Sequence, residues 1–191
     1  MSGSPLRIAL KEWAIVCELL AAGRCCLLLR KGGVHEDAGP GRFRLDHARF
    51  ALFPATEHER LDWIKPRFRT RTAPLPPRPE TVSIDAYADV VRVWEIPGRR
   101  AFDALDDLHP WATPQIDMRF DYKPDRPIYL VALRTYRLPA PRTVRYSDAY
   151  LGCRSWVELA EGDAIPIEGA HPVMRERELE GVVARVDAAF A

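Results

Sequence analysis

Cationic and aromatic side chains gather in two short blocks that lie far apart along this chain. The first begins at Leu10-Lys-Glu-Trp-Ala14 and continues at Leu27-Leu-Leu-Arg-Lys-Gly-Gly33, and the second is Tyr150-Leu-Gly-Cys-Arg-Ser-Trp156. Guanidinium and ammonium groups bind phosphate, and aromatic rings stack on bases. We therefore predict a nucleic-acid- or nucleotide-binding site whose contacts come from these residues: Lys11, Arg30, Lys31, Arg154 and Trp156.

The Arg30-Lys31-Gly32-Gly33 step follows an apolar run, and paired glycines let a ligand approach the backbone closely. The spacing G-x-x-x-x-G-K-[ST] of a Walker A loop is absent. A Nudix box needs a magnesium-binding E-x-x-E-E helix, whereas here Glu36-Asp37 is followed by Ala-Gly-Pro-Gly. The alternative to a phosphate site is a basic strand end with a tight turn.

Acidic residues and a histidine offer a second chemistry. Glu12, Glu36 and His58 would bind Mg²⁺ or Mn²⁺ if they converged, and Lys31 would stabilise the charge that develops on a phosphodiester. This alternative is a metal-dependent nuclease or phosphodiesterase, with charged groups about 4–6 Å apart. The opposing interpretation is that these residues are ordinary exposed polar side chains and helix caps.

That alternative resembles a degenerate PD-(D/E)xK nuclease core. The nearest matching string, Asp121-Tyr-Lys123, precedes a proline and lies outside any predicted strand. Outside the nuclease alternative we expect no metal ion and no cofactor. The four cysteines form no C-x-x-C pair, which argues against structural zinc and favours reduced, buried thiols.

Two further stretches are rich in cations. Residues 60–78 hold six cations and one acid, and residues 119–145 hold seven cations and two acids. Residues 66–80 also carry five prolines, which indicates a linker or a long surface loop. That loop supports another alternative, a protein-interaction subunit that docks through residues 66–80.

Composition sets limits on the class of protein. The 191 residues are 47% apolar with a formal net charge of +1, which is typical of one globular domain spanning residues 1–191. A sub-lobe boundary would fall in the loop 66–80. No apolar run is long enough to span a membrane, and Lys11, Glu12 and Glu18 interrupt the N-terminal one. We therefore expect a cytoplasmic protein without membrane contact.

The hydrophobic pattern predicts an α+β fold with a mixed, largely antiparallel sheet and packed helices. An apolar stripe predicts a helix over residues 6–22 that ends at Gly23. Further helices are expected at 55–65, 101–108, 113–122 and 173–190, and strands at 25–30, 43–53, 90–94 and 127–138, with a turn and an edge strand over 150–160.

The two blocks, together with Phe53-Pro54, Glu57-His58 and Leu133-Arg-Thr-Tyr-Arg-Leu-Pro139, resemble the bacterial domain-of-unknown-function family 1802. The resemblance runs from about residue 8 to residue 185. It implies that the blocks belong to one domain, and it transfers no catalytic role. The residues that it marks for testing are Lys11, Glu12, Arg30, Lys31, Glu36, His58, Arg154 and Trp156.

Overall fold

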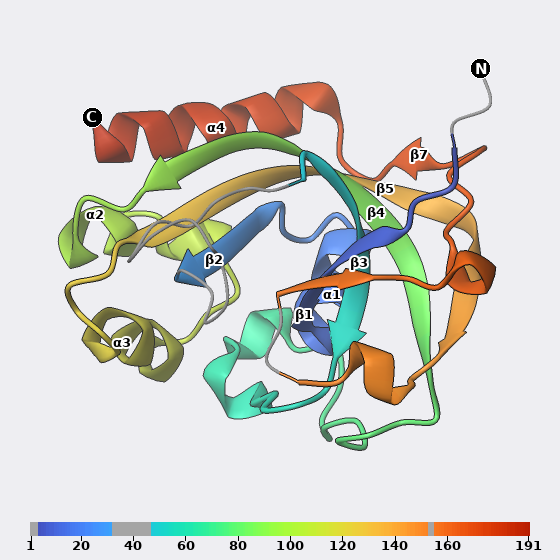
Figure 1. Ribbon diagram of the computed structural model, residues 1–191. Coiled ribbons are helices and arrows are strands. Elements are labelled where there is room, and N and C mark those ends of the chain that lie inside the picture. Colours follow the sequence, from blue (N-terminus) through green and yellow to red (C-terminus); the bar gives the residue numbers. More distant parts are fainter. Residues whose placement is uncertain (1–3, 32–46, 153–154) are drawn as a thin grey trace.

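The computed structural model describes residues 4–31, 47–152 and 155–191. Within these ranges seven strands form one sheet in the order β2-β5-β4-β3-β1-β6, with β7 beside β5 (Figure 1). The strands are β1 (Ile8–Trp13), β2 (Leu27–Lys31), β3 (Arg49–Ala55), β4 (Thr81–Glu95), β5 (Ile128–Arg145), β6 (Trp156–Glu158) and β7 (His171–Pro172). The helices are α1 (Ala14–Ala21), α2 (Arg99–Asp103), α3 (Thr113–Asp121) and α4 (Glu176–Phe190).

The predicted α+β class is confirmed. In the described part of the chain β1 and β3 pair in parallel, and the other strand pairs are antiparallel. The strands on either side of residues 66–80, β3 and β4, pair with each other. The proline-rich loop is therefore an excursion from one sheet.

The sheet curls until its two ends approach. The long strands β4 and β5 bend across the molecule under α4, while α2 and α3 lie at the end near β2 (Figure 1). Strands β2 and β1 are far apart in the strand order, yet Arg30 on β2 donates to the carbonyl oxygen of Lys11 on β1 at 3.5 Å. The curl thus brings the two halves of the first sequence block together.

The predicted helix over residues 6–22 is wrong in its first half. Residues 8–13 form β1, and only Ala14–Ala21 are helical. Every residue of α1 except Glu18 is buried, so the helix has no polar face. A short segment that is apolar on all sides lies inside the core, and its spacing does not distinguish a helix from a strand. Gly23 ends the segment as predicted, with a φ of 66°.

The predicted helix over residues 55–65 is also wrong. Thr56 and Glu59 have capping-box spacing, but both side chains bond to distant segments. The Thr56 hydroxyl donates to the carbonyl oxygen of Pro77 at 3.0 Å, and the Glu59 carboxylate accepts from the backbone N–H of Ile15 at 2.8 Å. Only the 3₁₀ turn Leu61–Trp63 remains helical.

The other predicted elements are present, with boundaries that differ. Strands β4 and β5 extend well beyond the predicted cores at 90–94 and 127–138, and α3 and α4 lie within the predicted helices. The N-cap of α3 is Ala112. The first residues of the predicted strand 43–53 lie outside the described part of the chain. No described helix has the length and apolarity needed to cross a bilayer.

Candidate functional site

The two sequence blocks touch. Leu10 on β1 is paired with Trp156 on β6, and the backbone N–H of Lys11 donates to the carbonyl oxygen of Ser155 at 2.8 Å. The Lys11 ammonium also donates to the carbonyl oxygens of Tyr150, at 2.8 Å, and Gly152, at 3.1 Å. Strand β1 is therefore the place where both blocks meet.

Strand β1 sends its functional side chains to opposite faces of the sheet. Successive side chains on a strand alternate, so Lys11 and Glu12 point away from each other. Ala9 and Lys11 face a core cluster that contains Phe53 and Tyr150. Leu10 and Glu12 face the main core, on the side where Trp156 stands opposite Leu10. One strand thus separates two polar environments.

The Lys11 face is a mostly buried polar network, in which Oε2 of Glu57 has no hydrogen-bond partner among the described residues. The side chain is 7% exposed, and its ammonium lies 3.6 Å from a carboxylate oxygen of Glu57, which also accepts a hydrogen bond from the Tyr146 hydroxyl. Burial raises the pKa of the Tyr146 phenol, and Glu57 raises it further. Tyr146 also lines a hollow of about 530 Å³ with Arg78 and other residues. We conclude that Lys11 fastens the second block to β1.

Among the described residues, the Glu12 face holds more cations than acids. Arg30 donates to the Glu12 carboxylate at 3.2 Å, with side chains that are only 13% and 10% exposed. Arg119 on α3 lies close to both: burial lowers the pKa of its guanidinium, while Glu12 raises it and Arg30 lowers it again. Two guanidinium groups therefore share one carboxylate in a mostly buried setting.

Two buried donors at this face have no hydrogen-bond partner within the described part of the chain. They are Nε of Arg119 and Nε1 of Trp156. The Trp156 ring packs edge-on against Phe50 and His47, each with centroids 5.1 Å away. A buried donor without a partner costs about 1–3 kcal/mol, so an unpaired donor marks a place where an acceptor is wanted.

Lys31 bonds to the backbone of α3. Its ammonium donates to the carbonyl oxygen of Arg119 at 2.6 Å and of Phe120 at 3.4 Å, in the last turn of that helix. Unpaired carbonyl groups and the helix dipole make a helix C-terminus attractive to a cation. Burial lowers the pKa of the Lys31 ammonium, and Arg119 lowers it further. Lys31 therefore anchors α3, the helix that supplies Arg119.

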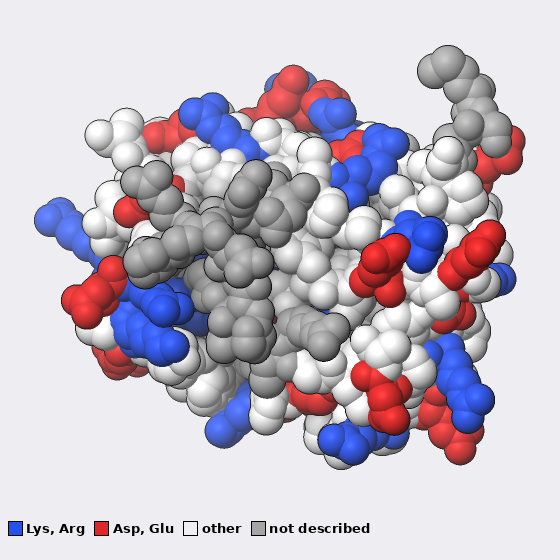
Figure 2. Space-filling view, in the orientation of Figure 1, with Lys and Arg blue, Asp and Glu red and all other residues white. Residues whose placement is uncertain are grey.

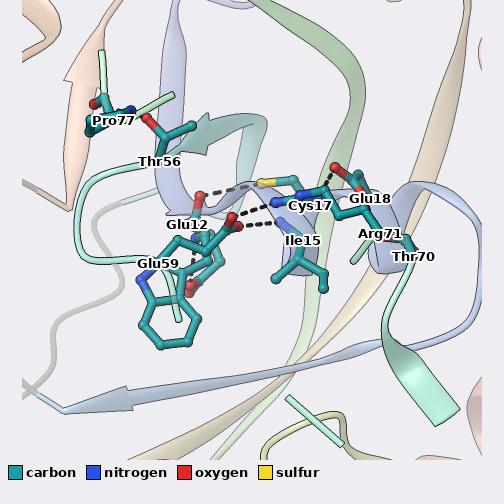
Figure 3. Close-up of polar contacts among 10 residues, drawn as sticks. Glu12, Ile15, Cys17, Glu18, Thr56, Glu59, Thr70, Arg71 and Pro77 are labelled. Carbon is teal, nitrogen blue, oxygen red and sulfur yellow. Dashed lines mark hydrogen bonds and ion pairs between the residues drawn. The ribbon is translucent and has the colours of Figure 1, made fainter. Parts of the chain in front are cut away.

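A second buried pair secures the start of α1 (Figure 3). The Glu59 carboxylate, whose side chain is 1% exposed, accepts from the N–H of Ile15 and pairs with Arg71. Arg71 also pairs with Glu18 on α1. The Glu12 carboxylate accepts from the N–H of Trp13 at 2.8 Å. These contacts tie residues 56–71 to the helix and fix the backbone next to Glu12.

Comparison with known proteins places nearly the whole chain in one family. A family described as a domain of unknown function, DUF1802, matches residues 9–185. The chain belongs to this family. No curated protein matches the chain. Among solved structures it is similar to the crystal structure of a mutant of the ZmASCH protein from Zymomonas mobilis, at 12% identity and a TM-score of 0.43, covering 83% of this chain and 93% of that one.

In this DUF1802 chain the described residues expected to converge on a metal ion lie in separate places. Glu12 pairs with Arg30, Lys31 anchors α3, and His58 is exposed in a turn with a φ of 60°. Glu36 lies outside the described residues, as does Arg154 of the expected ligand set. No group of three His, Cys, Asp or Glu side chains that could hold a metal ion occurs among the described residues.

Sequence reasoning missed Arg119, Glu57 and Tyr146 as members of these two environments. Arg119 was only one of seven cations in residues 119–145, and its position opposite β2 depends on the docking of α3. Several others in that stretch are engaged elsewhere, such as Arg134, which pairs with Glu176. In residues 60–78, Arg71 and Arg60 are likewise held in ion pairs.

Figure 2 shows how charge is distributed on one face. Lys and Arg side chains gather beside the undescribed atoms in the area of β2 and α3, with acids at the margins (Figure 1 and Figure 2). Elsewhere on this face the two signs are interspersed. The local excess of cations stands out because the whole chain is nearly neutral.

Proposed function

We propose that this protein binds nucleic acid or a nucleotide at the Glu12 face of β1. Arg30 and Arg119 contact the phosphate, and Trp156 contacts the base. The observation that carries the proposal is the buried Nε donor of Arg119, which has no partner among the described residues although a second guanidinium and a carboxylate lie beside it. Binding is the only event proposed, with no chemical step.

The electrostatics support an anionic ligand. Glu12 pairs with Arg30, and among the described residues Arg119 makes no ion pair, which leaves its positive charge in a mostly buried setting. Such a charge attracts an anion more strongly than a solvated surface charge does, because the local dielectric constant is lower. Guanidinium groups match the geometry of phosphate oxygens, which favours phosphate over a simple halide.

The aromatic part of the site supports a base. Trp156 is half-buried and leaves its indole N–H without a partner in the described part of the chain. An indole can stack on a base and donate to one of its acceptors. Stacking of this kind contributes about 1–3 kcal/mol per base, and it is tolerant of sequence.

The test is fluorescence anisotropy with labelled single-stranded and duplex RNA and DNA, at two salt concentrations. We expect binding that weakens with salt, and we expect Arg119→Gln to weaken it and to reduce the slope of log K against log salt by about 1. Arg177→Gln, at an exposed arginine on α4, is the matched control and should bind as the wild type does. Equal binding by all three proteins would contradict the proposal.

The metal-dependent nuclease remains the alternative prediction, and the same samples examine it. Cleavage of the labelled strand in Mg²⁺ or Mn²⁺, lost in Glu12→Gln, would assign Glu12 to a metal and would replace the binding role. The protein-interaction subunit is examined by limited proteolysis of residues 66–80. That segment is already held by Arg71 and by the buried Phe68, so we expect it to resist cleavage without a partner.

A further inference from the structure

A cavity beside α1 takes no part in the site proposed above. It has a volume of about 250 Å³, and it is bounded by α1, β3, the start of β4 and the proline-rich loop. Small residues on one face of α1, Ala14, Cys17 and Ala21, leave the space open. Leu75 stands at the margin of the cavity and is 40% exposed. The walls are largely apolar.

One carboxylate in this wall has no counter-charge. Asp85 makes no ion pair within the described part of the chain, and its hydrogen-bond partner there is the hydroxyl of Ser83 at 2.5 Å. The other polar side chains are engaged: Glu18 pairs with Arg71, and Thr56 donates to Pro77 (Figure 3). Asp85 is therefore the charged group that the cavity offers to a ligand.

The fold places Asp85 there through a break in the ladder between β4 and β5. Ile84 is paired with Arg142 and Ala86 with Arg137, so Asp85 stands opposite four residues of β5, Leu138-Pro-Ala-Pro141. The two prolines cannot donate to the ladder, which makes this a natural place for an irregularity. Such bulges change the direction in which one side chain points, and they are common beside binding sites.

Several carboxylates lie near the Cys17 thiol in the cavity wall. Burial raises the pKa of the Cys17 thiol well above its usual value, and four carboxylates, including Glu18 and Asp85, raise it further. Cys17 thus stays a neutral thiol in the cavity wall. An apolar cavity with a carboxylate that makes no ion pair among the described residues complements a molecule with an apolar body and one positive charge.

We propose that this cavity binds a small organic amine, with the ammonium group on Asp85 and the apolar body between α1 and Leu75. The amine is a monocation, because one carboxylate is left without a counter-charge. The site is independent of the nucleic-acid site, which lies at the Glu12 face of β1.

The test uses benzylamine as the probe, with benzyl alcohol as its uncharged counterpart. Each is titrated into ¹⁵N-labelled full-length protein, and amide shifts of residues 75–86 and of α1 are followed by NMR. We expect saturable shifts with benzylamine, at least about tenfold weaker binding of benzyl alcohol, and a similar loss in Asp85→Asn, because a charge-assisted hydrogen bond disappears. Glu95→Gln, at an exposed acid on β4, should bind as the wild type does.

A second variant tests the proposal independently, in case Asp85→Asn does not fold. Leu75→Trp adds bulk at an exposed margin, and it should weaken benzylamine binding while the remaining amide spectrum is unchanged. Equal binding of amine and alcohol, or unchanged binding in Asp85→Asn, would overturn the proposal.

Discussion

The ammonium nitrogen of Lys11 lies 2.8 Å from the carbonyl oxygen of Tyr150, a residue 139 positions further along the chain. This contact joins the two sequence blocks, and it makes Lys11 a structural cation. Without Lys11, the Glu57 carboxylate would lose its ion-pair partner in a mostly buried setting.

Replacing Lys11 by Met should therefore lower the free energy of unfolding by about 3–5 kcal/mol, because two carbonyl groups lose their donor and the Glu57 carboxylate loses its ion-pair partner. Urea denaturation measures the loss. The double variant Lys11→Met with Glu57→Gln should recover part of it, since the unpaired charge is then absent. Lys123→Met, at an exposed lysine, is the control. A loss under about 1 kcal/mol would show that water replaces the Lys11 contacts.

Arg119 should behave in the opposite way, because its guanidinium has a cationic neighbour and a donor without a partner among the described residues. We expect Arg119→Leu to leave the stability unchanged or to raise it by up to about 1 kcal/mol while it weakens binding of nucleic acid. Arg30→Leu removes the partner of Glu12 and should cost about 2–3 kcal/mol. Thermal unfolding and anisotropy on both variants test this contrast. A large loss of stability in Arg119→Leu would indicate a structural role.

Glu59 should control the order of the segment that leads to Arg71. Glu59→Ala removes the acceptor of the Ile15 amide and the partner of Arg71, and we expect a loss of about 2–4 kcal/mol. Hydrogen exchange of the Ile15 amide should rise in parallel. Asp62→Asn, in an exposed ion pair with Arg60, should leave the stability close to that of the wild type. Unchanged exchange at Ile15 would count against the capping role.

His109 predicts a pH dependence of stability. It is fully buried between Phe102 and Trp111. Burial, and after it the nearby Lys65 ammonium, lower the pKa of His109 to about 3. An unfolded histidine takes up a proton near pH 6.5, and the folded one does not. The contribution of the neutral His109 to the free energy of unfolding is therefore complete above about pH 6.5, and it is lost as the pH falls toward 3.

Between about pH 7.5 and pH 5 this linkage should lower the free energy of unfolding by about 2 kcal/mol. His109→Asn offers an amide oxygen in place of Nδ1, which lies 3.2 Å from the Lys65 ammonium. The variant should be less stable at both pH values, and the difference between them should shrink by about that amount. His171→Asn, at an exposed histidine, should keep the full difference. Equal pH dependence in His109→Asn and the wild type would refute the assignment.

Sequence patterns predicted the fold class and most strands, because a continuous apolar run such as Ile128–Leu133 in β5 leaves little choice of structure. They failed over residues 8–13, where a strand runs directly into a buried helix. The helical and the strand periods both fit the apolar positions there. They failed at Thr56 and Glu59 because local capping competed with tertiary partners, and the tertiary partners won.

The site was harder to predict than the fold. Cationic and aromatic residues of β1, β2 and β6 stood out by their types, and contact between Lys11 and the Tyr150 block followed from strand pairing that sequence does not reveal. Arg119 has no distinguishing neighbours in the sequence. Its role depends on α3 docking against Lys31, which is a long-range event.

The position of β2 at one end of the sheet has a consequence for synthesis on the ribosome. Its partner β5 begins at Ile128, so the buried side chains Leu27, Leu28 and Leu29 have no neighbouring strand until roughly a hundred more residues have been made. At about 5–20 residues per second this leaves an apolar strand unpaired for on the order of 5–20 seconds. The nascent chain therefore has a long interval in which chaperones can bind its N-terminal third.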